Sequence, residues 1–149
     1  MRHAVRAIIV KDQALLVMHR QKFGHEYYAL PGGGIDFGET AEQALTREIH
    51  EETGITFTKP LLVITEDAGQ IFGLQQIYLC EYVSGEPALD PGSEEAKITA
   101  LGQNLYKPLW LPLSELPQTE LLPPELKQIL IDKLPNNWPT EPLHIKIPD

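Results

Sequence analysis

Runs of apolar residues, some continuous and some alternating with polar residues, predict several β-strands along the chain. The first two runs are rich in aliphatic and β-branched residues and are separated by Lys-Asp-Gln, which predicts a hairpin near the start. In the run at residues 70–84 apolar side chains fall on both faces, so this strand is expected at the centre of a sheet. The predicted strands are residues 2–10, 14–20, 27–30, 55–67, 70–84 and 107–111.

Two other segments have the features of helices. Residues 40–53 contain neither proline nor glycine, Thr40 can cap the start with Gln43 at the position of a capping box, and Gly54 ends the segment. Residues 124–134 predict a second helix, which has a proline in its first turn. Strands on both sides of one strong helix, followed by a C-terminal helix, indicate an α/β or α+β fold with helices layered around one mixed sheet.

The remaining segments are polar or rich in turn-forming residues. Residues 85–106 are expected to form a long loop with at most one strand, and Ser114 is expected to cap a short turn. Loops of this length in compact domains tend to be functional or disordered. Residues 135–149 are rich in proline and are expected to be extended or loosely attached. The sequence shows no internal repeat and no long linker, so we predict one domain over residues 1–134 followed by a tail.

Charge and composition narrow the class of function. The chain has 149 residues and a net charge of -9 without a cluster of lysine and arginine, so it is not expected to bind extended DNA or RNA. One cysteine cannot form an internal disulfide, and no segment reads as a secretory signal or a membrane span, so we expect a soluble, cytoplasmic protein. A small anionic substrate would need a local positive charge, which a divalent cation held by carboxylates can supply.

The carboxylates of the helix predicted at residues 40–53 are not placed as on an ordinary solvated helix. Its apolar stripe, about 140° wide on a helical wheel, consists of Ala41, Ala44, Leu45 and Ile49. Glu48 and Glu52 fall inside this stripe, and Glu51 lies at its edge. The opposite face carries Gln43, Thr46, His50 and Thr53. Carboxylates crowded on an apolar face repel one another and resist desolvation, so they favour binding a proton or a cation.

The type of donor indicates the kind of metal. Oxygen ligands alone favour magnesium or manganese over zinc, which would require histidine or cysteine at short spacing. The glycines that precede the helix allow the backbone to approach an oxyanion or a metal, although the Lys-Ser or Lys-Thr of a nucleotide P-loop does not follow them. Arg47 borders the cluster, and both a pairing with its carboxylates and an ordinary surface ion pair stay open.

The spacing of these residues resembles the signature of the Nudix hydrolases. In order, the pattern is Gly33, five residues, Glu39, seven residues, Arg47-Glu48-Ile49, one residue, Glu51-Glu52, one residue and Gly54-Ile55, which matches every defined position. The His-Arg pair at the end of the second strand, the aromatic residue before Leu-Pro-Gly-Gly-Gly and the later Pro-Leu-Trp-Leu-Pro-Leu-Ser-Glu-Leu are also similar to the family. The resemblance covers residues 1–134 and implies a mixed sheet between helices and metal-dependent hydrolysis of a nucleoside diphosphate linked to another group.

Carried across by motif position, the resemblance implies roles for individual residues. The implied ligands of Mg²⁺ or Mn²⁺ are Glu48, Glu51 and Glu52, with a backbone carbonyl of Gly32 or Gly33. The implied catalytic residues are Arg47, Glu48 and Glu51, with Glu39 helping Arg47 to orient the cluster. The general base is either Glu48 or a glutamate of the long loop, Glu94 or Glu95, and these two can equally be solvated. Arg20 is a candidate phosphate clamp, and Tyr28 stands where the family often has tryptophan and is expected to pack.

The substrate is less defined than the chemistry. The stretch after the signature lacks the proline of typical ADP-ribose hydrolases, the tyrosine associated with dinucleoside polyphosphates and the Ser-Gln-Pro-Trp-Pro-Phe-Pro type of stretch of NADH-cleaving members. Nucleoside triphosphates, including damaged ones, and nucleotide sugars stay open as substrates. Further aromatic residues able to line a pocket are Phe23, His25, Phe72 and Tyr106. Two alternatives also stay open: a catalytically silent Nudix-like domain that senses a nucleotide or recruits a protein, and a homodimer formed through the tail.

Overall fold

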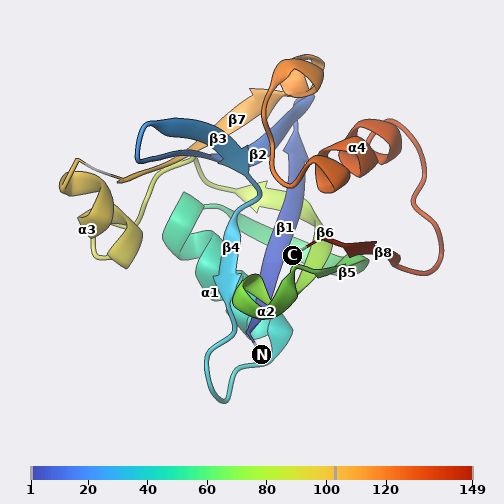
Figure 1. The fold of residues 1–149 in the computed structure, drawn as a ribbon, viewed down its shortest axis with the longest axis horizontal. Helices are drawn as coiled ribbons and strands as arrows, with labels where there is room; N and C mark the ends of the chain where they lie inside the picture. Colours follow the sequence, from blue (N-terminus) through green and yellow to red (C-terminus); the bar gives the residue numbers. More distant parts are fainter. Residues whose placement is uncertain (1, 103, 149) are drawn as a thin grey trace.

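The chain folds around one mixed β-sheet with helices on both sides (Figure 1), which a computed structural model describes for residues 2–102 and 104–148. In chain order the elements are β1 (His3–Lys11), β2 (Ala14–Lys22), β3 (His25–Ala29), β4 (Gly32–Gly34), α1 (Ala41–Thr53), β5 (Thr56–Asp67), α2 (Gly69–Phe72), β6 (Leu74–Ser84), α3 (Glu94–Ala100), β7 (Asn104–Pro112), the 3₁₀ helix η1 (Leu113–Gln118), α4 (Pro124–Lys133) and β8 (Leu143–Lys146). None of the helices in the described residues is long and apolar enough to span a membrane.

The strands within the described residues pair in the order β3-β2-β1-β6-β5-β8, and β4 and β7 pair with β1 and β2 outside this path. The pairs β1–β6 and β5–β8 are parallel, whereas the other pairs are antiparallel. β1 and β2 form the predicted hairpin, although they pair only next to the turn. β6 lies between β1 and β5, so the prediction of a central strand is confirmed.

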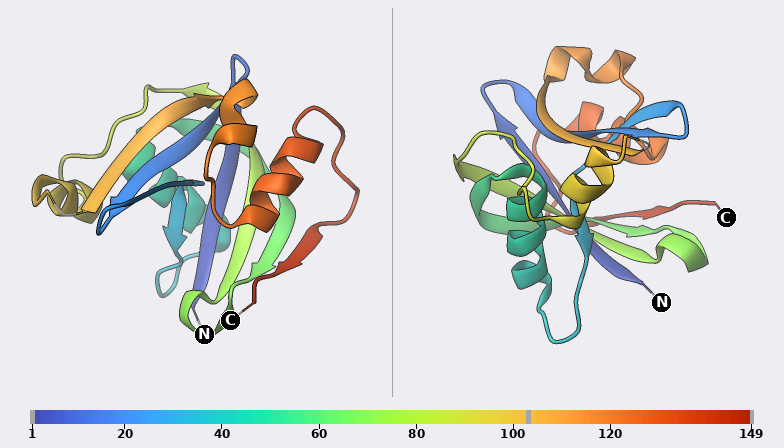
Figure 2. Two further views of the ribbon diagram at one scale, coloured as in Figure 1. Left: turned by 45° about the horizontal axis from the view of Figure 1, so that its top comes forward. Right: turned by 90° about the vertical axis from the view of Figure 1, so that its left-hand side faces the viewer.

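Successive residues of β1 face two apolar cores on opposite sides of the sheet, because side chains alternate along a strand. Ala7 lies in one core with Leu45 of α1, whereas Ile8 lies in the other with Leu126 and Leu130 of α4. Figure 2 shows α1 and α4 on opposite sides of these strands. The predicted fold class, a mixed sheet between helices, is therefore confirmed.

The helix that carries the signature begins and ends where the sequence predicts. The Thr40 hydroxyl accepts a hydrogen bond from the backbone N–H of Gln43, whose side chain accepts one from the backbone N–H of Thr40. Gly54 ends the helix with a φ of 70°, a left-handed conformation that glycine adopts without strain. The wheel placed Thr53 wrongly, because it is fully buried. Its backbone carbonyl accepts a hydrogen bond from Ala88, so the segment after β6 covers the last turn.

Two short helices occupy places where the sequence predicted other structure. α2 replaces the beginning of the strand predicted at residues 70–84, and Gly73, with a φ of 73°, separates it from β6. α3 interrupts the loop predicted at residues 85–106 and is capped by Ser93, whose hydroxyl accepts a hydrogen bond from the Ala96 N–H. β7 begins at Asn104, earlier than predicted, and Ser114 lies inside η1 and does not cap it.

The C-terminal segment adds a strand to the sheet. β8 pairs in parallel with the end of β5, and the backbone N–H of Ile147 donates to the carbonyl of Asp67 at 2.8 Å. Of the two expectations for the tail, the extended one is confirmed for this strand and the loosely attached one is wrong, because its backbone hydrogen bonds join it to β5. The boundary of the domain at residue 134 stays a prediction.

Candidate active site

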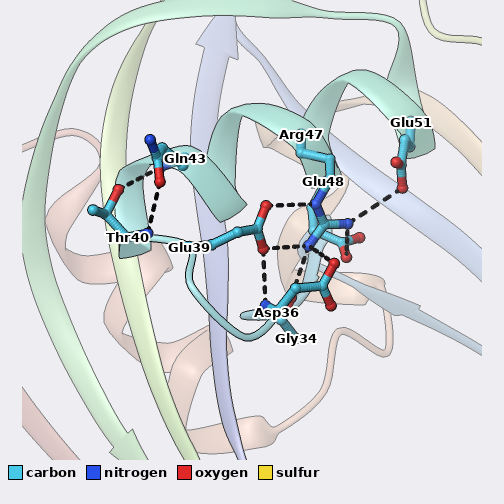
Figure 3. Close-up of polar contacts among 8 residues, drawn as sticks. All are labelled: Gly34, Asp36, Glu39, Thr40, Gln43, Arg47, Glu48 and Glu51. Carbon is cyan, nitrogen blue, oxygen red and sulfur yellow. Dashed lines mark hydrogen bonds and ion pairs between the residues drawn. The ribbon is translucent and has the colours of Figure 1, made fainter.

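Arg47 joins α1 to the loop that precedes it (Figure 3). Its Nε and Nη2 donate to the two carboxylate oxygens of Glu39 at 2.8 and 2.9 Å, and its Nη1 donates to Glu48 at 2.8 Å and lies 3.5 Å from Glu51. The hydrogen bonds from Arg47 lower the pKa of Glu39 to about 2, and those to Glu39 and Glu48 raise the pKa of Arg47 despite its partial burial. Arg47 thus pairs with the buried Glu48 of the carboxylate cluster as well as with the more exposed Glu51.

Glu48 and Glu52 are buried, as the apolar stripe predicted. They expose 8% and 5% of their surface, and Glu52 accepts a hydrogen bond from the backbone N–H of Gly32 at 2.7 Å. Burial raises the pKa of Glu52 to about 7, although the positive charge of Arg6 and the Gly32 bond oppose this shift. Burial also raises the pKa of Glu48, against the opposing effect of Arg47. Burial therefore makes both carboxylates more prone to bind a proton or a cation, and Glu52 does so near neutral pH.

The glycines of β4 bring the backbone against these carboxylates. A Cβ atom at Gly33 would lie 2.5 Å from the carboxyl carbon of Glu48, so only glycine leaves the carboxylate in its present position. At Gly32, where φ is 147°, a Cβ would collide with the backbone carbonyl of Val5 in the paired strand β1. The glycines therefore let the backbone of β4 lie directly against the Glu48 carboxylate.

The side chains offer oxygen ligands suited to a divalent cation, but in this conformation those oxygens accept hydrogen bonds from other groups of the protein. Within residues 2–102 and 104–148, no three Asp, Glu, His or Cys side chains are grouped closely enough to hold a metal ion as they stand. Arg47 lies against Glu48 and Glu51, and Glu52 is turned towards the Gly32 N–H. The carboxylate oxygens of these residues are of the type that Mg²⁺ and Mn²⁺ prefer as ligands.

A cavity of about 920 Å³ lies beside this cluster, and several of the predicted site residues line it. Those that line it are Arg20, Gly32, Gly33, Glu48, Glu52 and Glu95. Arg47, Glu39 and Glu51 form the ion-paired group next to it, whereas Tyr28 and Glu94 are outside its described lining. Of the two loop glutamates, the structure thus brings only Glu95 to the cavity.

Arg20 is held in place by the protein itself. Its Nε donates to the carbonyl of Leu105 at 3.1 Å, its Nη2 donates to Asn104 at 3.0 Å, and its Cζ lies 3.7 Å from the centre of the Tyr106 ring. The ring centre of Tyr27 lies 5.7 Å from the same Cζ atom. Arg20 therefore presents a fixed, aromatic-stacked cation to the cavity.

The aromatic residues of β3 divide between the core and the cavity. Tyr28 stacks on His19 with 4.8 Å between the ring centres and packs against the core, as expected. Tyr27, which the sequence gave no reason to select, lines the cavity, because neighbouring residues of a strand face opposite sides. Phe72 and Tyr106 also line it, whereas Phe23 lines a smaller pocket and His25 lies 3.0 Å from Glu120.

The sequence reasoning missed several polar residues of the cavity, and those buried or hydrogen-bonded within it include Arg6, Glu66 and Gln75. A signal for Glu66 was present, because it alternates in phase with the core residue Ile64 within a predicted strand. A glutamate on the core-facing side of a strand is as unusual as one in the apolar stripe of a helix. Burial raises the pKa of Glu66 and lowers that of Arg6.

Comparison with known proteins agrees with this geometry. A family model described as NUDIX domain matches residues 1–132. The ADP-ribose pyrophosphatase of Methanocaldococcus jannaschii is 34% identical over 70% of this chain and 64% of its own length, and the NAD-capped RNA hydrolase NudC of Photobacterium profundum is 32% identical over 74% and 37%. The crystal structure of a MutT NUDIX hydrolase from Burkholderia pseudomallei superposes with a TM-score of 0.65 and 27% identity, covering 89% of this chain and 97% of that one.

The chain spans 64% or less of the length of these two curated relatives. Each alignment leaves out a larger share of the relative than of this chain, so each relative contains further sequence outside the aligned region.

Proposed function

The chain belongs to the NUDIX domain family, and from this premise we propose that it is a pyrophosphohydrolase acting on a nucleoside diphosphate linked to another group. Nudix hydrolases generally need divalent metal ions, and we assign Mg²⁺ or Mn²⁺ here because the donors are carboxylate and carbonyl oxygens. The observation that carries the proposal is the arrangement of Glu48 and Glu52, buried beside the glycine backbone of β4 in a large cavity.

The proposed roles follow from the contacts. Glu48, Glu51 and Glu52 would hold the metal with a backbone carbonyl of Gly32 or Gly33, and the cation, when bound, would neutralise and polarise the diphosphate. Arg47 would keep the carboxylates in position, because Glu39 fixes its guanidinium through two parallel hydrogen bonds.

A general base must take the proton of the water that attacks phosphorus as the pyrophosphate P–O bond breaks. Glu48 and Glu95 are the candidates, and the contacts of the two differ. Glu48 already accepts a hydrogen bond from Arg47, whereas no ion pair holds Glu95 among the described residues, and it lines the cavity from α3. We therefore favour Glu95. Glu95→Gln should lower kcat by roughly a hundredfold or more, with the neighbouring Glu94→Gln as the matched control at an exposed site. Equal rates in the two variants would transfer this role to Glu48.

The proposal as a whole is tested with Glu51→Gln and Glu52→Gln. Each should remove most metal-dependent turnover while far-UV circular dichroism shows an unchanged fold, because a neutral amide is a poor ligand for a hard cation. Near-normal turnover in both variants would overturn the assignment.

The substrate is sought among nucleoside di- and triphosphates, nucleotide sugars, ADP-ribose and dinucleotides, with release of phosphate or pyrophosphate as the readout. The similarity to an ADP-ribose pyrophosphatase favours ADP-ribose, and the missing proline marker disfavours it. Triphosphates and nucleotide sugars are therefore tested beside it, and the products show which phosphorus is attacked.

The alternative of a catalytically silent domain is disfavoured because the described structure retains every carboxylate of the signature beside the cavity. Tight nucleotide binding without product release across the whole panel would support it. The homodimer also stays a proposal, and sedimentation of the full chain at micromolar concentration tests it, since a monomer mass would exclude it.

A further inference from the structure

Glu66 is a buried carboxylate that the proposed chemistry does not use. It exposes 7% of its surface and lines the same cavity as Glu48 and Glu52, and its Oε1 has no hydrogen-bond partner among residues 2–102 and 104–148. A buried acceptor without a partner lowers stability, so proteins seldom keep one that has no purpose. A donor on a ligand in the cavity that reached Oε1 would supply the missing hydrogen bond.

The neighbours of Glu66 on the sheet are already engaged. Glu66 on β5 is paired with Gln75 on β6, so their side chains lie next to each other on one face. Gln75 accepts a hydrogen bond from Nε of Arg6 at 3.2 Å and donates one to the carbonyl of Phe72 at 3.1 Å. These bonds hold the Gln75 amide in place, so Glu66 is the acceptor that is left for a ligand on this part of the sheet.

The walls of the cavity near this acceptor are apolar and partly aromatic. Ile71 and Phe72 of α2 expose 81% and 60% of their surface, and both line the cavity together with Pro123 and Leu126 at the start of α4. Because Phe72 is tied through its carbonyl to Gln75, its backbone is adjacent to the strand that pairs with Glu66. A planar ring bound here would cover these exposed apolar side chains.

On the premise of the proposed function, we propose that Glu66 selects the nucleobase of the substrate by accepting hydrogen bonds from two adjacent N–H groups on its edge. An ionised carboxylate only accepts hydrogen bonds, and its two oxygens suit two parallel donors. Guanine presents such a pair at N1 and its 2-amino group. Adenine and cytosine place an acceptor next to their amino group, and uracil has acceptors on both sides of its N–H. A guanine-type base therefore fits Glu66.

Binding of nucleoside monophosphates to the full chain tests this inference, because it requires no bond cleavage. Isothermal titration in EDTA at about pH 8, where a carboxylate is favoured in its ionised form, compares GMP, IMP, AMP and dGMP. IMP lacks only the 2-amino group. The wild type should bind GMP about ten- to hundredfold more tightly than IMP and AMP, and dGMP as tightly as GMP.

Glu66→Gln should reduce this preference to less than threefold, because the amide offers one acceptor and one donor. Glu81→Gln on β6 makes the same chemical change at an exposed site outside the cavity lining and should keep the preference. Equal affinity for GMP and IMP in the wild type, an unchanged preference in Glu66→Gln, or no measurable binding of any of the four would overturn the inference. So would a loss of affinity for dGMP, which would assign Glu66 to the ribose hydroxyls.

The outcome is separable from that of the proposed function. If the chain prefers GMP but cleaves no nucleotide in the substrate panel, the proposed function fails and the base preference stands. If it cleaves nucleotides with no preference for the base, the inference about Glu66 fails and the hydrolase stands.

Discussion

Single methyl groups added to the three glycines of β4 should have three different effects. In Gly34→Ala the new Cβ meets nothing closer than 3.9 Å, so this variant is the control. In Gly33→Ala the Cβ would lie 2.5 to 2.8 Å from the carboxyl atoms of Glu48, which is the mobile end of a side chain. In Gly32→Ala the Cβ collides with the backbone of β1, which cannot move alone.

The magnitudes follow from what each methyl displaces. Gly34→Ala should change stability by less than about 1 kcal/mol, because alanine restricts the unfolded chain where the backbone tolerates it. Gly33→Ala pushes the Glu48 carboxylate out of its 2.8 Å hydrogen bond with Arg47, and such a charged bond is worth roughly 1.5–3 kcal/mol. Since Arg47 is partly exposed and alanine restricts the unfolded chain, a net loss of about 1–2 kcal/mol is expected. Gly32→Ala separates β4 from β1 and should cost more than about 4 kcal/mol.

Urea denaturation followed by far-UV circular dichroism measures the stabilities, and isothermal titration with Mn²⁺ measures metal binding. We expect Gly34→Ala to retain both properties, Gly33→Ala to keep the fold and lose metal affinity, and Gly32→Ala to lose the fold. Metal affinity in Gly33→Ala equal to that in Gly34→Ala would refute the placement of Glu48 in the metal site. Comparable damage in all three variants would refute the contacts of β4.

Three further variants test other contacts of the structure. Arg47→Lys removes the planar guanidinium that binds Glu39 and should lower the free energy of unfolding by roughly 1–3 kcal/mol. A double-mutant cycle with Glu39→Gln that gives no coupling energy between the two residues would contradict this. Thr40→Ala removes the cap of α1 and should lower the free energy of unfolding by about 1 kcal/mol in the same denaturation assay. Thr40→Ser keeps the hydroxyl and should be nearly neutral. Equal losses of stability in the two variants would argue against the cap. Burial raises the pKa of Glu66 above its ordinary value of 4.5, so the folded state binds this proton more tightly than the unfolded state. The contribution of Glu66 to stability therefore falls as the pH rises above 4.5, until the folded-state pKa is passed. Glu66→Gln removes this loss, so the stability of the variant relative to the wild type should increase from pH 4.5 upwards. A constant difference in stability between variant and wild type from pH 4 to 8 would contradict the burial of a titrating carboxylate.

The elements that the sequence predicted well are those in which local signals agree. In α1, the capping residues, the absence of proline and glycine, and the terminal Gly54 all define the same helix, and the apolar stripe places Glu48 and Glu52 in the interior. These features depend on residues within one helix, so tertiary structure is not needed to infer them. Thr53 was the exception, because the segment that covers it comes from beyond β6.

The features that the sequence did not predict depend on contacts between distant segments. α3 has only seven residues in a polar stretch, so its periodicity is too short to identify it, and the approach of Glu95 to the cavity could not be inferred. The position of Tyr27 in the cavity was missed for a similar reason. Which face of β3 points to the cavity is set by its register with β2, and that register is not visible in a strand of five residues.

The short strand β8 has a consequence for how this protein behaves at high concentration. It pairs with Ile64 to Asp67, the last four residues of the 12-residue strand β5, whose unpaired backbone would otherwise be a template for pairing with other chains. β8 itself has four residues and is flanked by Pro142 and Pro148, so it offers little backbone for further strand addition. The C-terminal segment thus shields this end of β5 from edge-to-edge pairing. A chain shortened at residue 134 is expected to form larger particles over time, which light scattering would detect, rather than to dissociate into smaller ones.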